Sequence, residues 1–322
     1  MTFFPDVRLH VVTGKGGTGK TTVAAALAIA LSTGGRRVLL CEVEGRQGIA
    51  PLFGQPALPH QERRVARTDG GGEVDALAID PDEALIEYLE LFYHLGRAGR
   101  LLRRMGAVDF VTTIAPGLRD VLLIGKVKEA IVRRSGAGHV YDAVVLDGPP
   151  TGRIVRFLGA TDEVAQLAKV GPIRSQSEAV TALLRSSQSA VHIVTLLEEM
   201  PVQETVDGVA DLERAGLPVG AVIVNRVRDP QLPADDLAKA AAGRLDLDAL
   251  AAALAQVGID AGPDVIKVLG EEAGEHARRV ALQHEERGEL KSLGRPLFEL
   301  PLLAGPLELG ELCELADALV AP

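Results

Sequence analysis

Short apolar runs alternate along the chain with longer segments in which apolar residues recur at helical spacing. The first run, Leu9 to Thr13, is rich in β-branched residues and leads at once into glycines, and the Ala-rich segment Thr22 to Leu31 follows. This order predicts a strand, a loop and a helix. Four further apolar runs predict buried strands. They are Arg37 to Val43, Ala143 to Leu146, Val191 to Leu196 and Val219 to Asn225.

The alternation of apolar strands with amphipathic helices determines the expected fold class. Continuously apolar strands are typical of a parallel sheet that helices cover on both faces. We therefore expect an α/β fold in which one domain, residues 1–322, contains a mostly parallel, doubly wound sheet. Helical patterns without a strong strand signal over residues 82–135 and 161–186 predict insertions that form one helical subdomain. The segment Ala234 to Val257 is expected to form a surface helix or pair of helices.

A phosphate-binding motif occupies the loop between the first predicted strand and helix. Gly14-x-x-x-x-Gly19-Lys20-Thr21 satisfies the P-loop pattern, in which backbone N–H groups and a helix N-terminus surround phosphate oxygens. Lys20 is expected to reach the β- and γ-phosphates of a nucleotide, and Thr21 to bind Mg²⁺. The other residues of the predicted nucleotide-binding segment are Lys15, Gly16, Gly17, Thr18 and Thr22.

Lys15 at the start of this loop gives the deviant form of the Walker A motif. In that class the first lysine reaches across to the nucleotide of the partner subunit, so Lys15 predicts a dimer that encloses two ATP molecules. A second candidate metal residue follows the apolar run Val144 to Leu146. Asp147 stands where a carboxylate is needed to hold Mg²⁺ through water. The alternative for Asp147 is a strand-terminal residue that caps a turn.

Segments along essentially the whole chain resemble the ArsA-like family of arsenical-pump-driving and tail-anchored-protein-targeting ATPases. Besides the P-loop, Asp147 to Gly152 with Arg156 resembles the second switch loop of the family, and Pro116-Gly117 opens a helix as in its helical subdomain. The resemblance implies a magnesium-dependent ATPase of the P-loop class. It also implies a dimer, of identical chains or with a paralogous ATPase, whose opening and closing follow the nucleotide.

Further resemblances imply residues around the nucleotide. Leu196-Leu197-Glu198, followed by Glu204-Thr205, resembles a stretch whose first glutamate contacts nucleotide, which implies that role for Glu198. Val224-Asn225-Arg226 resembles the strand end where an asparagine contacts adenine, although an isolated Asn is more often a turn residue. The run Leu300 to Leu303 resembles the segment that closes the adenine pocket, which implies that Pro301 and Leu302 line it.

The sequence departs from the family at its first switch loop. The family has Thr-Asp-Pro-Ala-His there, and this chain has Val43-Glu44-Gly45-Arg46-Gln47. Glu44 keeps a carboxylate at the position that orients the attacking water, but it is one methylene longer, and a proline is replaced by Gly45. We expect slower or differently gated hydrolysis. A solvated loop residue is the alternative for Glu44.

Cysteine and charge exclude several relatives. Cys41 and Cys313 are the only cysteines, so one chain has neither a Cys-x-x-Cys zinc clip nor the three thiols of an arsenite site. The formal net charge of −10 argues against nucleic acid as a partner. No apolar stretch reaches the length that crosses a bilayer, so an integral membrane protein is not expected and the expected compartment is the cytoplasm.

Two functions remain open from the sequence. The first is an ATPase whose dimer opens and closes with nucleotide state and thereby acts on a hydrophobic client protein or a membrane-transport partner. The second is a regulatory scaffold that binds ATP, assembles with a paralogous subunit and hydrolyses little because of Glu44.

Overall fold

The computed structural model describes residues 4–93, 116–136, 138–167 and 172–320. Its main element is an eight-stranded sheet in the order β10-β9-β8-β1-β7-β2-β4-β3, in which every neighbouring pair is parallel except β3 and β4. The strands are β1 (Leu9–Gly14), β2 (Arg37–Glu42), β3 (Arg63–Thr68), β4 (Gly72–Ala78), β7 (Ala143–Asp147), β8 (Ser189–Thr195), β9 (Val219–Val227) and β10 (Leu297–Pro301). A separate small ribbon pairs β5 (Arg134–Ser135) with β6 (Gly138–His139).

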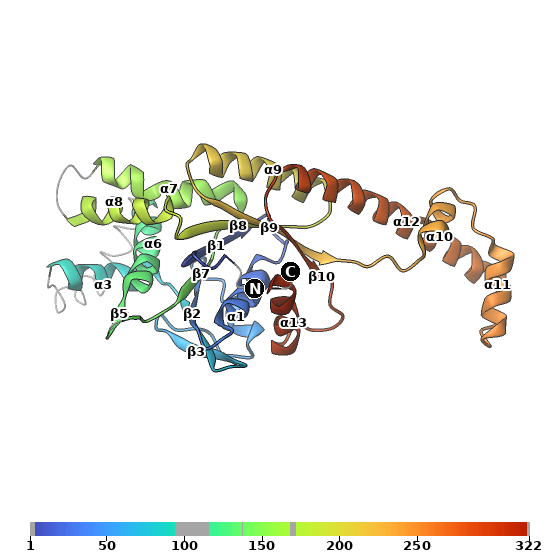
Figure 1. The fold of residues 1–322 in the computed structure, drawn as a ribbon, viewed down its shortest axis with the longest axis horizontal. Coiled ribbons are helices and arrows are strands. Elements are labelled where there is room, and N and C mark those ends of the chain that lie inside the picture. The colour runs from blue at the N-terminus through green and yellow to red at the C-terminus, as the bar shows by residue number, and fades with distance from the viewer. Residues whose placement is uncertain (1–3, 94–115, 137, 168–171, 321–322) are drawn as a thin grey trace.

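Helices cover both faces of the sheet (Figure 1). They are α1 (Lys20–Ser32), α2 (Ile49–Leu52), α3 (Pro81–Tyr93), α6 (Pro116–Val132), α7 (Thr151–Leu167), α8 (Pro172–Leu184), α9 (Glu199–Arg214), α10 (Ala234–Ala241), α11 (Leu247–Gln256), α12 (Pro263–Ser292) and α13 (Leu309–Val320). Alternate residues of one strand face opposite cores: Val12 packs with α1 and α13, whereas Val11 packs with α6, α7, α8 and α9. The expected mostly parallel, doubly wound α/β fold is confirmed.

The five predicted strands correspond to β1, β2, β7, β8 and β9, but β3, β4 and β10 were not predicted. The first of these contains three arginines in six residues, which hides any apolar pattern. One of them, Arg64, and Arg37 of β2 are both paired with the same acid of β4. Arg64 Nε and Arg37 Nη2 donate to the two oxygens of buried Asp75 over 2.5 and 2.7 Å. The antiparallel β3–β4 hairpin therefore closes one edge of the sheet with an ion-paired cluster.

Helices α3, α6, α7 and α8 gather at one end of the molecule (Figure 1). Within this group, α6 packs against α3, α7 and α8. Residues 94–115 and 168–171 lie outside the described residues, so a helical subdomain made from 82–135 and 161–186 stays a prediction. The carboxyl end of the first range is β5, which is a strand.

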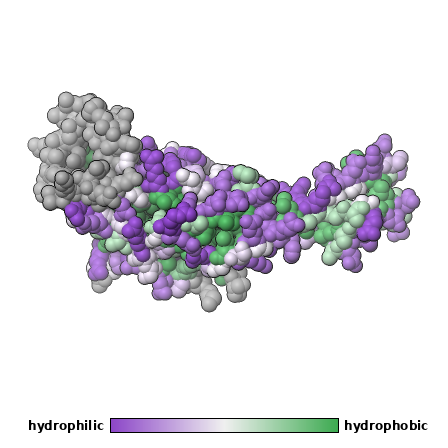
Figure 2. Space-filling view, turned by 90° about the horizontal axis from the view of Figure 1, so that it is seen from above, coloured by the Kyte–Doolittle hydropathy of each residue, from purple (hydrophilic) through white to green (hydrophobic). Residues whose placement is uncertain are grey.

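A helical arm extends from the opposite end of the sheet (Figure 1). It comprises α10, α11 and the 30-residue α12, all in the connection between β9 and β10. Figure 2 shows hydrophobic surface at the far end of the arm. Where α11 leads into α12, the exposed apolar side chains are Val257, Ile259, Val265, Val268 and Leu269. No helix in the described parts of the chain is both long and apolar enough to span a membrane.

Two histidines share a hydrogen bond in the middle of the sheet. His10 Nδ1 lies 3.1 Å from His192 Nε2, and both residues are fully buried. Because the Ala221 N–H donates to His192 Nδ1 over 3.0 Å, a neutral His192 donates through Nε2 to His10, whose own Nε2 donates to the Val7 carbonyl. Burial lowers the pKa of His10 to about 3 and the pKa of His192 well below its usual value. The pair is stable only while both rings are neutral.

We predict that this pair makes the fold sensitive to acid. The folded pKa of His10 lies below the unfolded value near 6.5, so its contribution is present above pH 6.5 and is lost as the pH falls toward the folded pKa. Between pH 7 and pH 5 the loss from His10 amounts to about 2 kcal/mol. Urea unfolding of wild type and His10→Gln at both pH values checks this: the variant should lose less stability on acidification. His284→Gln, at an exposed position of α12, is the control and should follow wild type. Equal pH dependence in all three proteins would contradict the prediction.

Candidate functional site

The strand ends place the predicted site residues at one edge of the sheet. Strand β1 ends at Gly14 between β7, which ends at Asp147, and β8, which ends at Thr195. The next strand, β2, ends with Glu42 paired in register with Asp147. In an open parallel sheet, ligands bind outside the carboxyl ends of the strands. This edge is therefore the candidate functional site.

The loop from β1 to α1 requires glycine at its two ends. Gly14 has φ 153°, and a Cβ there would lie 2.2 Å from the Val194 carbonyl oxygen. Gly19 has φ 88°, and a Cβ there would lie 2.3 Å from Asn225 Nδ2. Between them Gly16 and Gly17 are exposed, and Thr18 closes the turn by donating from Oγ1 to the Lys15 carbonyl over 2.9 Å.

Helix α1 begins directly after this loop with no side chain capping its N-terminus. Its first N–H groups therefore remain free of side-chain acceptors, which is the arrangement that suits an anion. Lys20 lies at this point with a side chain that is nearly buried, and its Nζ donates to the Lys15 carbonyl over 3.4 Å. Burial lowers the pKa of Lys20, while the charges of Asp147 and Glu44 oppose that shift. A cation thus lies inside the loop next to an uncapped helix start.

Thr21 and Asp147 form the candidate metal site. The Thr21 hydroxyl donates to Asp147 Oδ2 over 2.7 Å, and its oxygen lone pairs remain for a cation. Asp147 Oδ1 is buried and has no hydrogen-bond partner among the described residues. Burial raises the pKa of Asp147 to about 6, although the Thr21 hydrogen bond opposes the rise. A hydroxyl and an unsatisfied buried carboxylate oxygen are ligands that fit Mg²⁺.

Glu42 lies beside this pair and was missed in the sequence. It is 2% exposed, its Oε1 accepts from the Gly48 N–H over 3.1 Å, and its Oε2 is a second buried oxygen without a partner among the described residues. The signal was available, because the run Arg37–Glu42 ends in an acid as Ala143–Asp147 does. The predicted strand Arg37 to Val43 includes Glu42, but of the two glutamates the predicted site contains only Glu44, two residues further along the chain.

Glu44 lies in the loop after β2 and is paired with two arginines. Its oxygens lie 3.5 Å from Arg46 Nη2 and 3.7 Å from Arg153 Nη1. The other terminal nitrogen of Arg153 lies 3.9 Å from Asp120 Oδ1 on α6. A chain of charges therefore connects the site with the helices at that end of the molecule.

Lys15 lies at the rim of the loop and is held by α9. Its Nζ is 2.8 Å from Glu204 Oε1, and the Thr151 hydroxyl at the start of α7 donates to Glu204 Oε2 over 3.4 Å. Both side chains of the ion pair are partly exposed, at 29% and 38%. Lys15 thus points to its own α9 in this single chain, and a position in a partner's site stays a prediction.

The residues predicted around adenine lie at the ends of β9 and β10. Asn225 is buried; its Nδ2 donates to the Thr18 carbonyl over 2.9 Å and its Oδ1 accepts from the Arg226 N–H. Asn225 therefore supports the glycine-rich loop, a contact that the sequence did not predict. Pro301 pairs with Val227, and the Leu302 N–H donates to the Val227 carbonyl over 2.8 Å.

Two further predicted residues lie nearby on helices. Glu198 is exposed at the N-cap of α9, just beyond the end of β8, and makes no capping hydrogen bond with its side chain. Thr22 is half-buried in the first turn of α1. The adenine and nucleotide contacts of Glu198, Asn225, Pro301 and Leu302 stay predictions.

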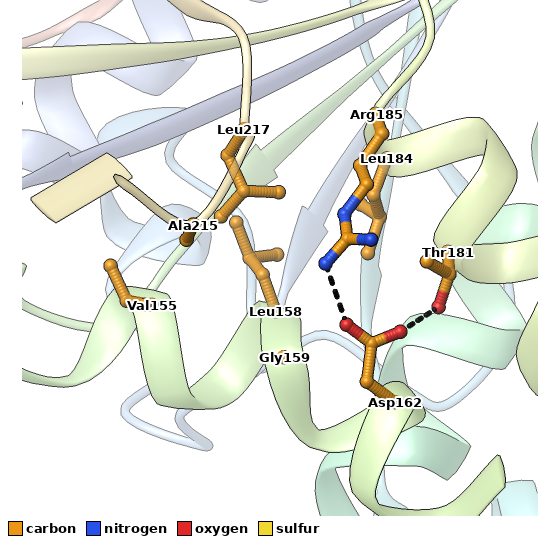
Figure 3. A pocket seen from close by; sticks show the side chains of 9 residues that line it. All are labelled: Val155, Leu158, Gly159, Asp162, Thr181, Leu184, Arg185, Ala215 and Leu217. Carbon is orange, nitrogen blue, oxygen red and sulfur yellow. Dashed lines mark hydrogen bonds and ion pairs between the residues drawn. The ribbon is translucent and has the colours of Figure 1, made fainter. Parts of the chain in front are cut away.

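A hollow of about 110 Å³ between α7, α8 and the start of β9 is separate from this site (Figure 3). It lies beside the amino ends of β8 and β9, and its lining is largely apolar. Its charged groups satisfy one another, since Asp162 accepts from both Arg185 and Thr181 over 2.8 and 2.7 Å.

Comparison with known proteins gives a family match over the site. Residues 7–184 match the family described as anion-transporting ATPase. The chain is 54% identical over 314 residues to the protein named ATPase BagA of Mycobacterium tuberculosis, covering 97% of this chain and 92% of that protein. It is 27% identical to a protein of Aquifex aeolicus that is provisionally named arsenical pump-driving ATPase 2, and the match covers 73% of this chain and 84% of that protein. It is 29% identical to ATPase get3 of Neurospora crassa, and the match covers 53% of this chain and 48% of that protein.

The hydrogen bond from Asn225 generates a prediction about the loop. Asn225→Ala should weaken binding of a non-hydrolysable ATP analogue and of inorganic tripolyphosphate by a similar factor, about fivefold, because one buried hydrogen bond that shapes the phosphate loop is lost. Calorimetric titration with both ligands measures this. A loss confined to the ATP analogue would mean that Asn225 acts on the base alone and would contradict the supporting role.

Proposed function

Because this chain belongs to the anion-transporting ATPase family, we propose that it binds ATP together with Mg²⁺ and hydrolyses the γ-phosphate bond as a dimer. One observation carries the proposal. The Thr21 hydroxyl is bound to Asp147, whose second oxygen is buried and without a partner among the described residues, directly beside the P-loop. A phosphate-binding loop next to a ready metal site is the arrangement that nucleotide hydrolysis requires.

Binding of the phosphates is assigned to the loop and the helix start. Backbone N–H groups of the segment Gly16 to Thr22 would donate to phosphate oxygens, with the dipole of α1 favouring their negative charge. Lys20 would then exchange its long hydrogen bond to the Lys15 carbonyl for the β- and γ-phosphates. This exchange is favourable because a charge-assisted bond to phosphate is shorter and stronger than one to a carbonyl.

Thr21 and Asp147 would hold the metal, Thr21 directly and Asp147 through water, while Thr21 keeps donating to Asp147. The bound Mg²⁺ would neutralise phosphate charge and stabilise the charge that develops in the transition state. Once Glu44 has left its partners Arg46 and Arg153, its carboxylate would orient the attacking water. Since the protein contributes mainly position and charge to phosphoryl transfer, the setting of Glu44 would control the rate.

A dimer is proposed from Lys15. In the single chain Lys15 is bound to Glu204 at the rim of the site rather than to the P-loop. On assembly with an identical or a paralogous chain, Lys15 would leave Glu204 and reach the partner's nucleotide. The fairly exposed ion pair is weak enough to be broken at little cost.

Coupling to a partner is proposed through Arg153. Arg153 lies between Glu44 in the site and Asp120 on α6, so a change at the γ-phosphate would change the contact with that helix. The helices at that end would then bind or release a hydrophobic client protein or a membrane-transport partner. The alternative function, a scaffold that binds ATP but hydrolyses little, is supported by the pairing of Glu44 with Arg46 and Arg153, because Glu44 would not orient water until it leaves them.

We predict that Lys15 and Lys20 act on the same nucleotide from different chains. Lys15→Ala and Lys20→Ala should each abolish ATP turnover, but only Lys20→Ala should also abolish analogue binding. An equal mixture of the two variants should regain about a quarter of wild-type turnover, because half of the dimers are mixed and each contains one complete site. Turnover and molecular mass, with and without the analogue, are measured together. An inactive mixture of chains that do exchange would contradict action in trans, and a wild type that binds without turnover would favour the scaffold.

Coupling through Arg153 predicts a separate result. In wild type a non-hydrolysable ATP analogue should change hydrogen exchange in α6, and Arg153→Ala should reduce that change by more than half while keeping analogue binding. Arg214→Ala removes a more exposed arginine from α9, whose ion pair within the described residues is the local one with Asp211, and should behave as wild type. An α6 response of equal size in Arg153→Ala would contradict the coupling.

A further inference from the structure

Two buried carboxylates meet at the ends of β2 and β7. Glu42 and Asp147 are paired in register on adjacent parallel strands, and they are 2% and 8% exposed. Each has one oxygen with a protein donor: Gly48 N–H for Glu42 and the Thr21 hydroxyl for Asp147. Each also has one oxygen, Glu42 Oε2 and Asp147 Oδ1, without a hydrogen-bond partner in the described parts of the chain.

Such a pair is costly unless positive charge lies between its members. An unpaired buried carboxylate oxygen loses its hydration without compensation, and a second one nearby adds repulsion. Lys20 is the one buried lysine or arginine among the described residues. Its Nζ is bound to the Lys15 carbonyl, and the ion pairs of the described residues include none between Lys20 and either acid. The remaining candidate is the metal that the P-loop site is built to receive.

Glu42 also fixes the loop that follows β2. Its Oε1 holds the backbone of Gly48, and Gln47, with φ 54°, is bound through both side-chain atoms to the backbone of Leu58. Gly48 in turn packs on Thr21, since a Cβ on Gly48 would lie 3.3 Å from Thr21 Cγ2. The loop that contains Glu44 is thus anchored on a carboxylate whose other oxygen has no hydrogen-bond partner among the described residues.

We propose that Glu42 is a second carboxylate of the metal site, with Oε2 facing Mg²⁺ beside Asp147 Oδ1 while Oε1 anchors the loop 43–48. This inference rests on the proposed function for the identity of the metal. Glu42 is a positioning residue: it holds a water of the metal shell and sets the place of the loop that contains Glu44. A bound metal ion would offset the repulsion between Glu42 and Asp147, and Glu42 would then hold both the metal shell and the loop 43–48.

Metal binding tests this directly with Mn²⁺ as the probe. Titrations followed by electron paramagnetic resonance are run on the full chain without nucleotide and on its complex with a non-hydrolysable ATP analogue. Glu42→Gln keeps a carbonyl-type acceptor for Gly48 and removes only the charge. It should weaken Mn²⁺ binding about tenfold in both titrations, as loss of a supporting group around a metal typically does. Glu73→Gln removes the same charge at the amino end of β4, opposite the carboxyl ends of the strands that form the site. Glu73 pairs there with Arg64, and the change should leave Mn²⁺ binding unchanged.

A structural role alone would give a different pattern. If Glu42 only anchors the loop, Glu42→Gln retains wild-type Mn²⁺ affinity in both titrations, and the proposal is overturned. A tenfold loss in the nucleotide-free protein supports Glu42 even when wild type fails to bind the ATP analogue, a result that would overturn the proposed function instead. Analogue binding in the presence of a chelator should be equal in wild type and Glu42→Gln. If Glu42→Gln also loses analogue binding in the chelator, the loop has collapsed and a second variant is needed. Glu42→Asp keeps the charge and should then restore Mn²⁺ binding to within about threefold of wild type. Failure of Glu42→Asp to restore it also overturns the proposal.

Discussion

The site depends on the position of β1 between β7 and β8 in a parallel sheet. Parallel pairing brings the carboxyl ends of all three strands to one edge, and the register fixes which residues meet there. Gly14 must follow the strand without a side chain because the Val194 carbonyl occupies that space. The glycine loop, the start of α1 and the acid at the end of β7 are consequences of this one arrangement.

Charge at this edge is only partly balanced in the single chain. Lys20 is buried against a carbonyl, Glu42 and Asp147 each keep an oxygen without a partner among the described residues, and Lys15 and Glu44 are bound to groups outside the phosphate loop. A nucleotide with Mg²⁺ would supply both the anion that Lys20 lacks and the cation that the two acids lack. Lys15 is paired with Glu204 on α9, and Glu44 is paired with Arg153 on α7. Binding of the nucleotide would therefore alter contacts with both helices.

Much of this arrangement was predictable because its signals are local. A β-branched run, a glycine loop with two lysines and an Ala-rich helix specify β1, the phosphate loop and α1 without reference to distant residues. The strand β3 escaped prediction because the charge of Arg64, one of its three arginines, is paired with Asp75 on the neighbouring strand β4, a contact that no local pattern specifies. Helices α10 and α11 of the arm lie within the segment Ala234 to Val257 that was predicted to be helical, whereas the long helix α12 was not predicted. The supporting role of Asn225 depends on a neighbour that is 207 residues away in the chain, which no local pattern specifies.

We propose that ATP binds at the carboxyl end of β1 with its metal between Thr21 and the acids of β2 and β7. A crystal structure of the protein with a non-hydrolysable ATP analogue and Mg²⁺ would show whether it does. We expect the γ-phosphate against Lys20, the metal on the Thr21 hydroxyl, and Asp147 still accepting from that hydroxyl. A nucleotide bound elsewhere, for instance beside Asp162 between α7 and α8, or a metal remote from Thr21, would contradict it.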